Sequence, residues 1–234
     1  MKENFQLNNS FYDLEKGFTE FEIGHMASND EMSWGETEDT TQLSAYESFH
    51  FPNSVPQAER LNSVLWRSLE QYIIKEGGSA VNKRISVFTG PVLNKKEPVY
   101  KNDKTFQVPL LFWKVIVFQW KDQIWSTGFI MSHEKRLRDD LKILIYPKAS
   151  EKFGEESELF RDYKYKQVFQ VNVNLIEKHT GLRFKWKNVK WIQIAEDTLQ
   201  LKKISETTSA SDIEKSAGKK QKLKIKLNMV LPKK

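Results

Sequence analysis

The sequence predicts an α+β fold with a mostly antiparallel central sheet and flanking helices. Runs rich in β-branched and aromatic residues indicate strands, and one long amphipathic segment indicates a helix. The strands and the helix do not alternate regularly along the chain, as they would in a parallel α/β sheet. A chain of 234 residues with 39% hydrophobic content is long enough to bury the core of one domain.

Three runs predict the main strands: RISVFTGPVL (84–93), FQVPLLFWKVIVFQW (106–120) and QIWSTGFIMS (123–132). The dipeptide Lys121-Asp122 separates the last two, so we expect them to form a tight hairpin. Residues 168–184, VFQVNVNLIEKHTGLRF, predict a short strand and then a short helix that stops at Gly181.

The long amphipathic segment is AERLNSVLWRSLEQYIIKEGG, residues 58–78. Its apolar residues recur at spacings of three and four, as on one face of a helix: Leu61, Val64, Leu65, Leu69 and Ile73. Pro56 stands near the start of this helix, and Gly77-Gly78 ends it.

The ends and the connecting segments carry weaker patterns. Residues 1–21 predict an irregular lead-in or a short helix, residues 22–45 an acidic loop, and residues 136–165 a charged, partly helical segment. Towards the end of the chain the composition shifts to Ser, Thr, Lys and Ala, which is typical of a linker. We therefore expect a folded domain over residues 1–204 and a Lys-rich tail over residues 205–234.

The positive charge of the chain is concentrated in this tail. The net charge is +6, and residues 202–234 hold ten Lys against three acidic residues, a net of +7 that leaves −1 for residues 1–201. A basic tail can bind a nucleic acid through phosphate contacts and counterion release. The residues expected to do so are Lys219, Lys220, Lys222 and Lys224. A solvated, solubilising tail is the alternative.

Several classes of site and of location are excluded or disfavoured by composition. The chain has no Cys, which excludes disulfides, thiolate nucleophiles and Cys-based zinc sites. Its four His residues, at positions 25, 50, 133 and 179, lack the spacing of zinc ligands, and no Gly-x-Ser-x-Gly elbow occurs. No run reaches the roughly 18 apolar residues of a membrane span, and the opening MKENFQLNNS lacks the apolar core of a secretory signal.

A series of short motifs points to one family. The stretch EIGHMASNDEMSWG (22–35) contains a Gly-His pair, an acidic stretch and Trp-Gly. The matching positions that follow are Asn53, Pro56-Gln57, Leu61-Asn62, Trp66, Leu69-Glu70, VFTGPVL (87–93), VPLLFWKVIV (108–117) and HTGLRF (179–184). In this order they resemble the DNA/RNA non-specific endonucleases, the sugar-non-specific nucleases built on a ββα-metal motif. The resemblance covers roughly residues 20–190.

The resemblance implies a role for four residues. His25 would be the general base, and Asn62 the only direct protein ligand of one Mg²⁺ ion, for which Mn²⁺ can substitute. A hard cation that keeps most of its waters suits an amide oxygen. Glu70 follows Asn62 by eight residues, about 12 Å along an ideal helix, so a role through water fits better than shared ligation. Asn53 would position the phosphate or the loop.

The resemblance thus implies a Mg²⁺-dependent endonuclease that hydrolyses phosphodiester bonds of DNA and RNA without strong sequence preference. Two departures support an alternative, a catalytically weak or inactive truncated relative that only binds nucleic acid. The family's Asp-Arg before Gly-His is Glu22-Ile23 here, and only 24 residues precede His25, where relatives carry further strands. The retention of both His25 and Asn62 favours the active enzyme. Family members are often exported, so the compartment is left open, as is the oligomeric state.

Overall fold

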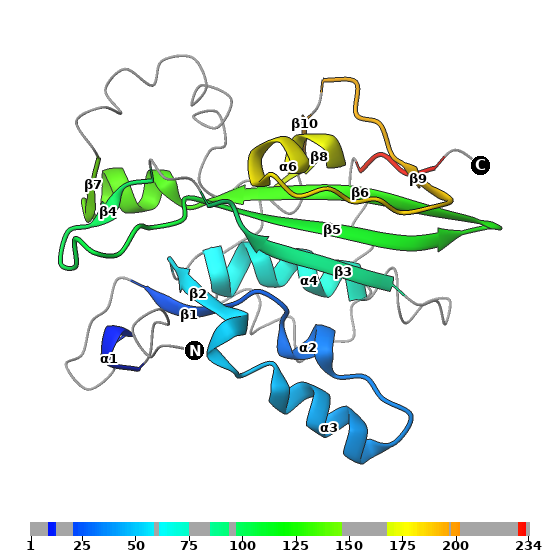
Figure 1. Cartoon of the computed structure of the whole chain (residues 1–234), viewed down its shortest axis with the longest axis horizontal. Coiled ribbons are helices and arrows are strands. Elements are labelled where there is room, and N and C mark those ends of the chain that lie inside the picture. Colours follow the sequence, from blue (N-terminus) through cyan, green and yellow to red (C-terminus); the bar gives the residue numbers. More distant parts are fainter. Residues whose placement is uncertain are drawn as a thin grey trace, which may run out of the picture.

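A six-stranded sheet forms the centre of the molecule (Figure 1). The computed structural model describes residues 9–12, 21–58, 61–74, 85–93, 97–146, 168–196, 198–201 and 229–232. The sheet order is β10-β8-β6-β5-β3, with β9 beside β6, and every pairing is antiparallel except β9 with β6. These strands are β3 (Ile85–Pro91), β5 (Leu111–Trp120), β6 (Gln123–Ser132), β8 (Val168–Val171), β9 (Val189–Trp191) and β10 (Thr198–Gln200). The predicted α+β fold with a mostly antiparallel sheet is confirmed.

The longest pairing in this sheet is the hairpin of β5 and β6. Its register runs from Leu111 opposite Ser132 to Trp120 opposite Gln123, so two residues form the turn. The first of them, Lys121, has a φ of 53°, which two-residue hairpin turns require. The hairpin predicted around this dipeptide is confirmed.

A two-stranded sheet comes before the predicted helix of residues 58–78 in the chain, on the same side of the central sheet as that helix. Strand β1 (Glu22–His25) pairs antiparallel with β2 (Ser54–Gln57). The chain then enters the predicted helix, which begins as a π-helical turn, η3 (Leu61–Trp66), and continues as α4 (Arg67–Ile73). The order strand, strand, helix is the arrangement that the family resemblance implies.

The prediction that residues 22–45 form a loop is wrong. They contain β1, the short helix α2 (Asn29–Met32) and most of α3 (Glu38–Glu47), after which the short helix η2 (Phe51–Asn53) leads into β2. Both α2 and α3 begin with a capping box, and neither buries a residue. These helices are stabilised by their caps and bury no apolar face, so hydrophobic periodicity in the sequence does not predict them.

The remaining elements are short. They are α1 (Asn9–Tyr12), the strand pair β4 (Val99–Tyr100) and β7 (Leu144–Ile145), the turn η5 (Arg136–Asp140) and α6 (Val173–Thr180). The expected charged, partly helical segment is confirmed at η5, and its part from 147 to 165 lies outside the described residues. None of the helices in the described ranges is long and apolar enough to cross a membrane.

Most of the predicted tail lies outside the described residues. Residues 229–232 are described, and they lie against β8. Gln170 of β8 donates a hydrogen bond to the Val230 oxygen at 2.9 Å and accepts one from the Val230 nitrogen at 2.8 Å. The end of the chain is therefore attached to the folded body.

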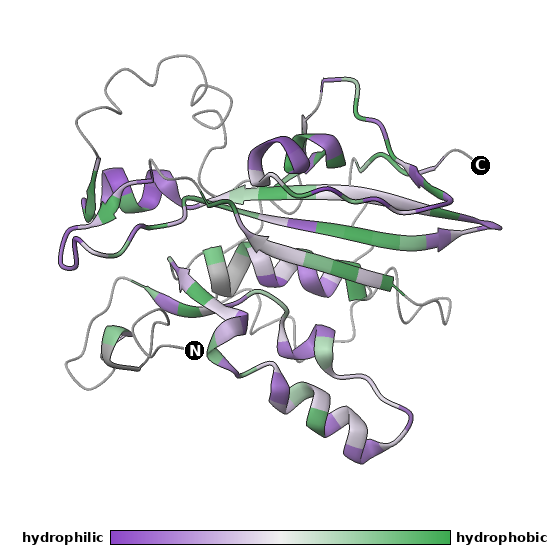
Figure 2. Cartoon of the chain, in the orientation of Figure 1, coloured by the Kyte–Doolittle hydropathy of each residue, from purple (hydrophilic) through white to green (hydrophobic). Residues whose placement is uncertain are grey.

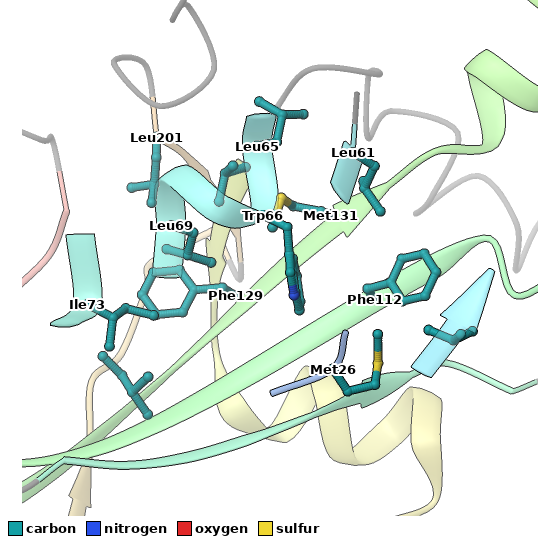
Figure 3. Packing of buried hydrophobic residues seen from close by; sticks show 13 residues of the cluster. Met26, Leu61, Leu65, Trp66, Leu69, Ile73, Phe112, Phe129, Met131 and Leu201 are labelled. Atoms are coloured by element: carbon teal, nitrogen blue, oxygen red, sulfur yellow. The ribbon is translucent and has the colours of Figure 1, made fainter. Parts of the chain in front are cut away.

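The central sheet has a separate hydrophobic core on each face. Met26, Leu61, Trp66 and Leu69 pack with Phe112 between the helix and one face, as Figure 3 shows. The other core joins β5 and β8 to α6 through Trp113, Val115, Val171 and Ile176. Figure 2 shows hydrophobic residues along the central strands and a largely hydrophilic α3. The two cores place β1, β2 and α4 on one face and α6 on the other.

Gly181 ends α6 with a left-handed backbone, at a φ of 73°, as the sequence predicted. Nothing lies within 4 Å of the place where a Cβ atom would stand, so a substitution there acts through backbone strain alone. We expect Gly181→Ala to lower the free energy of unfolding by about 1 kcal/mol, and Gly181→Asn to lower it less. Urea denaturation measures both, and an alanine variant as stable as the parent would contradict the strain.

Candidate active site

His25 stands at the end of β1, where it faces Ser54 across the strand pair. Its side chain is half-buried, and its ring meets Phe49 edge-on with 5.2 Å between the ring centres. Burial lowers the pKa of His25 below its ordinary value of 6.5. The imidazole is therefore neutral at neutral pH, which is the state that a general base needs.

Asn53 holds the loop that follows His25. Its amide nitrogen donates to the main-chain oxygens of Ala27 and Ser48, each at 2.8 Å, and its amide oxygen accepts from Ala27 N at 2.9 Å. Its main-chain oxygen also accepts from Met26 N at 2.8 Å. Both amide hydrogens are thus used within the loop. Of the two roles predicted for Asn53, positioning the loop is the one that these bonds fit.

Lys114 of β5 is fully buried, and sequence analysis did not assign it to the site. Its Nζ donates to the main-chain oxygen of Met26 at 3.0 Å and to Glu31 Oε2 at 2.9 Å. It also lies 3.1 Å from Glu70 Oε1 and 4.8 Å from the centre of the Trp66 ring. One cation therefore connects the central sheet, the loop after β1 and the helix. The signal in the sequence was a lysine that interrupts an apolar strand.

The cluster of Lys114, Glu31 and Glu70 holds one cation and two carboxylates. When all three are ionised, it carries a net negative charge in a buried place, which is unfavourable. Burial raises the pKa of Glu70 to about 7, with Lys114 opposing the rise and Glu31 adding to it. Glu70 therefore exchanges a proton near neutral pH.

Gln57, the last residue of β2, covers Gly24 of β1. A Cβ atom on Gly24 would collide with the side chain of Gln57, so this position requires glycine. The Gln57 side chain is fully buried, and its amide forms no hydrogen bond with any residue in the described ranges. A buried amide without partners is unfavourable, so a hydrogen bond to water or a contact with a ligand would stabilise this side chain.

His133 shows by contrast what a structural histidine looks like in this chain. It is fully buried, accepts a hydrogen bond from Ala58 N at Nδ1 (3.1 Å) and donates one from Nε2 to the Pro109 oxygen (2.7 Å). Burial lowers the pKa of His133 to about 4. Both ring nitrogens are engaged in the core, so His133 is no candidate for the base.

The predicted site residues meet only in part within the described structure. His25 and Asn53 belong to one strand pair and loop, and Glu70 is linked to that loop through the buried lysine. Asn62 lies in η3, the turn that follows β2, but its side chain is outside the described residues. Outside them too are Lys219, Lys220, Lys222 and Lys224. In the described part, no three His, Asp or Glu side chains gather in a way that could hold a metal ion.

A comparison with known families identifies the class of protein. The sequence model of the DNA/RNA non-specific endonuclease family matches residues 1–190, which is more than half of the chain. The chain belongs to this family, as its motifs predicted. This family consists of nucleases, which are hydrolases with nucleic acid substrates, and it generally depends on a divalent metal. A search of the curated proteins found no match.

The raised pKa of Glu70 makes a prediction about stability. The unfolded chain releases this proton near 4.5, whereas the folded chain keeps it up to about pH 7, so Glu70 lowers stability as the pH rises between those values. We expect Glu70→Gln to reduce the fall in unfolding free energy between about pH 4 and pH 8 by on the order of 3 kcal/mol. Urea denaturation at both pH values measures this fall.

The matched control is Glu196→Gln, which removes an exposed glutamate. It should leave the fall in unfolding free energy as it is in the parent chain. If Glu70→Gln shows the same fall as this control, Glu70 titrates at its ordinary pKa in the folded protein.

Proposed function

We propose that this chain is a Mg²⁺-dependent endonuclease that cuts DNA and RNA without strong sequence preference. The observation that carries the proposal is the placement of His25, a half-buried histidine whose pKa is lowered, at the end of a strand in a chain that belongs to a nuclease family. Loop contacts to Asn53 and Lys114 hold the residue that follows it. The base is thus neutral and its loop is fixed before substrate arrives.

In the proposed reaction, His25 accepts a proton from the water that attacks the phosphorus atom. The oxygen of that water forms a bond to phosphorus as the bond to the leaving oxygen breaks, the leaving oxygen takes a proton from solvent water, and His25 then releases its proton to solvent. A neutral imidazole can take the proton, whereas an imidazolium cannot. Glu70 would act through water and not on the phosphate itself, since its carboxylate faces the buried lysine.

Asn62 is the residue proposed to hold the metal. Bound Mg²⁺ would supply positive charge to the phosphate oxygens as negative charge builds on them. The buried, unpaired amide oxygen of Gln57, four residues before the start of η3, is a hard donor of the kind that Mg²⁺ and its waters prefer. Mn²⁺, which has similar preferences, is the proposed substitute.

The alternative is a weak or inactive relative that only binds nucleic acid. Ile23 supports it, since this residue replaces the family's arginine, and it packs against the apolar cluster of Tyr12, Phe21 and their neighbours. A guanidinium is therefore missing next to the proposed site. The Lys-rich tail is proposed to bind phosphates in either case.

The role of His25 makes the first prediction of this proposal. His25→Ala should reduce nicking of supercoiled plasmid by about 10²–10⁴-fold, because no other group takes the proton. His50→Ala is the matched control, since His50 is exposed and its contacts with Glu47 and Tyr46 lie on the surface. Because the pKa of His25 is lowered, the parent's rate should rise with pH below about 6.5 and become level above it.

Equal nicking by the His25 and His50 variants would rule out His25 as the base. If neither the folded parent nor any variant nicks the plasmid in the presence of Mg²⁺, the chain is the inactive relative of the alternative proposal and not an active endonuclease.

Asn62 makes the second prediction. Asn62→Ala should weaken Mn²⁺ binding at least tenfold, as seen by the electron paramagnetic resonance signal of free Mn²⁺, because an inner-sphere oxygen is lost. The melting temperature of the metal-free protein should change little. Asn102→Ala, which removes an exposed surface asparagine, is the control. Mn²⁺ binding by Asn62→Ala at the parent's affinity would assign the metal to other ligands.

A further inference from the structure

Residues 182–191, which we call the basic strip, run between α6 and the end of β9 with the sequence LRFKWKNVKW. Basic and aromatic residues alternate in it. The side chains of Arg183, Lys185, Lys187 and Lys190 are exposed, whereas the apolar residues between them are half-buried. No Asp or Glu occurs from residue 178 to residue 195. The strip therefore presents an uninterrupted positive edge.

The backbone of the basic strip is fixed at both ends. Near its start, the Phe184 nitrogen donates to the Glu177 carboxylate on α6 at 2.6 Å. At its end, β9 pairs with β6, with Trp191 opposite Ser126, and the next residue, Ile192, donates to the Ser126 oxygen at 2.9 Å. The charged side chains thus extend from a backbone whose position is fixed by these hydrogen bonds.

Aromatic contacts hold the middle of the strip. The rings of Phe184 and Trp186 lie 4.8 Å apart, and Trp186 lies 5.1 Å from Phe88 of β3. Phe184 also meets Trp113 of β5 edge-on at 5.9 Å. The aromatic residues of the strip therefore pack against the sheet, and the lysines between them face solvent.

The lysines of the strip have no acidic partner in the described part of the chain. Every ion pair found there involves other residues. Lys190 lies 5.5 Å from the centre of the Trp125 ring, and Arg183 donates only to main-chain oxygens. The turn at η5 differs, because its Arg138 and Lys135 are paired with carboxylates. Within the described ranges, no carboxylate neutralises this positive edge.

The basic strip packs through its aromatic residues on the face of the sheet opposite the candidate active site, whereas Lys190, which alternates with Trp191 in β9, lies over Trp125 on the other face. Its aromatic residues belong to the core on the α6 side, whereas Met26, next to His25, belongs to the core on the α4 side. Figure 1 shows the same separation, with the segment of β9 on one side of the central strands and β1, β2 and α4 on the other.

We propose that the basic strip is a second nucleic-acid-binding site, which holds the phosphate backbone of a long substrate away from the site of cleavage. Charge complementarity identifies the partner, since exposed lysines on a fixed backbone, with no carboxylate beside them in the described ranges, bind phosphates and release counterions. The choice of nucleic acid rests on the proposed function. Phosphate contacts do not read bases, so the strip adds affinity for DNA or RNA of any sequence.

The test compares two triple variants of the full chain. In the strip variant, Lys185, Lys187 and Lys190 are changed to Gln. In the control variant, three exposed lysines elsewhere are changed to Gln: Lys101, Lys104 and Lys142. Binding to a labelled duplex is followed by fluorescence anisotropy in chelator, so that no cleavage occurs, over a range of salt concentrations. Circular dichroism shows whether each variant is folded, and Lys185→Gln alone serves if the triple strip variant is not.

The strip variant should flatten the log–log salt dependence of binding by about 2 to 3 units, since each phosphate contact contributes roughly 0.9, and Lys185→Gln by about 1. The control variant should change the slope by less than one unit. A strip variant with the parent's slope, or with the slope of the control variant, would overturn the proposal and leave the strip as a solvated edge or a surface for an acidic protein.

Cleavage separates this proposal from the proposed function. The strip variant should raise KM for plasmid while hydrolysing a small phosphodiester, bis-p-nitrophenyl phosphate, at the parent's rate, since that ester is too small to contact the active site and the strip together. A reduced rate on the small ester would place the strip's effect in the active site and overturn a separate binding role. If the parent cleaves neither substrate but the strip variant still flattens the salt dependence, the binding site stands and the enzyme assignment fails.

Discussion

The ammonium group of Lys114 is the interaction on which the candidate site depends. Burying a lysine is unfavourable unless its charge is paired and its hydrogens are bonded, and here two carboxylates and a main-chain oxygen surround it. Those partners come from the loop after β1 and the adjoining α2, and from α4, so the cation on β5 connects three parts of the chain that are distant in sequence. Removing it would leave two buried carboxylates facing each other, and the loop that carries His25 would lose its fixed support.

The same cluster links the architecture to proton chemistry. Two carboxylates and one lysine cannot all be ionised without a net buried charge, so a proton stays on Glu70 up to about pH 7. His25 responds in the opposite way, since burial makes its neutral form easier to reach. Near neutral pH, the site thus combines a free base with a carboxyl group that is partly protonated, and both states follow from burial.

Sequence patterns predicted those structural features that depend on residues close together along the chain. The β5–β6 hairpin followed from two apolar runs and a two-residue turn, and the end of α6 from Gly181. Strand β1 was missed because four residues, Glu-Ile-Gly-His, show no alternation and pair with a strand that comes much later. The role of Lys114 was missed for the same reason, since its partner Glu31 lies 83 residues away and only the folded chain brings them together. Motif order could identify the family, but not the contacts that support the loop after His25.

Strand β5 joins the two faces of the sheet through simple alternation. Lys114 and Phe112 lie towards the helix and the His25 loop, whereas Trp113 and Val115 lie towards α6 and the basic strip. A shift of one residue in the pairing of β5 would exchange these sets, placing the lysine in the aromatic core and a tryptophan under the loop. Both the buried cluster and the packing of the strip would then be lost together. The register of one strand, fixed by its pairing with β3 and β6, thus holds the proposed chemistry on one face and the aromatic packing of the basic strip on the other.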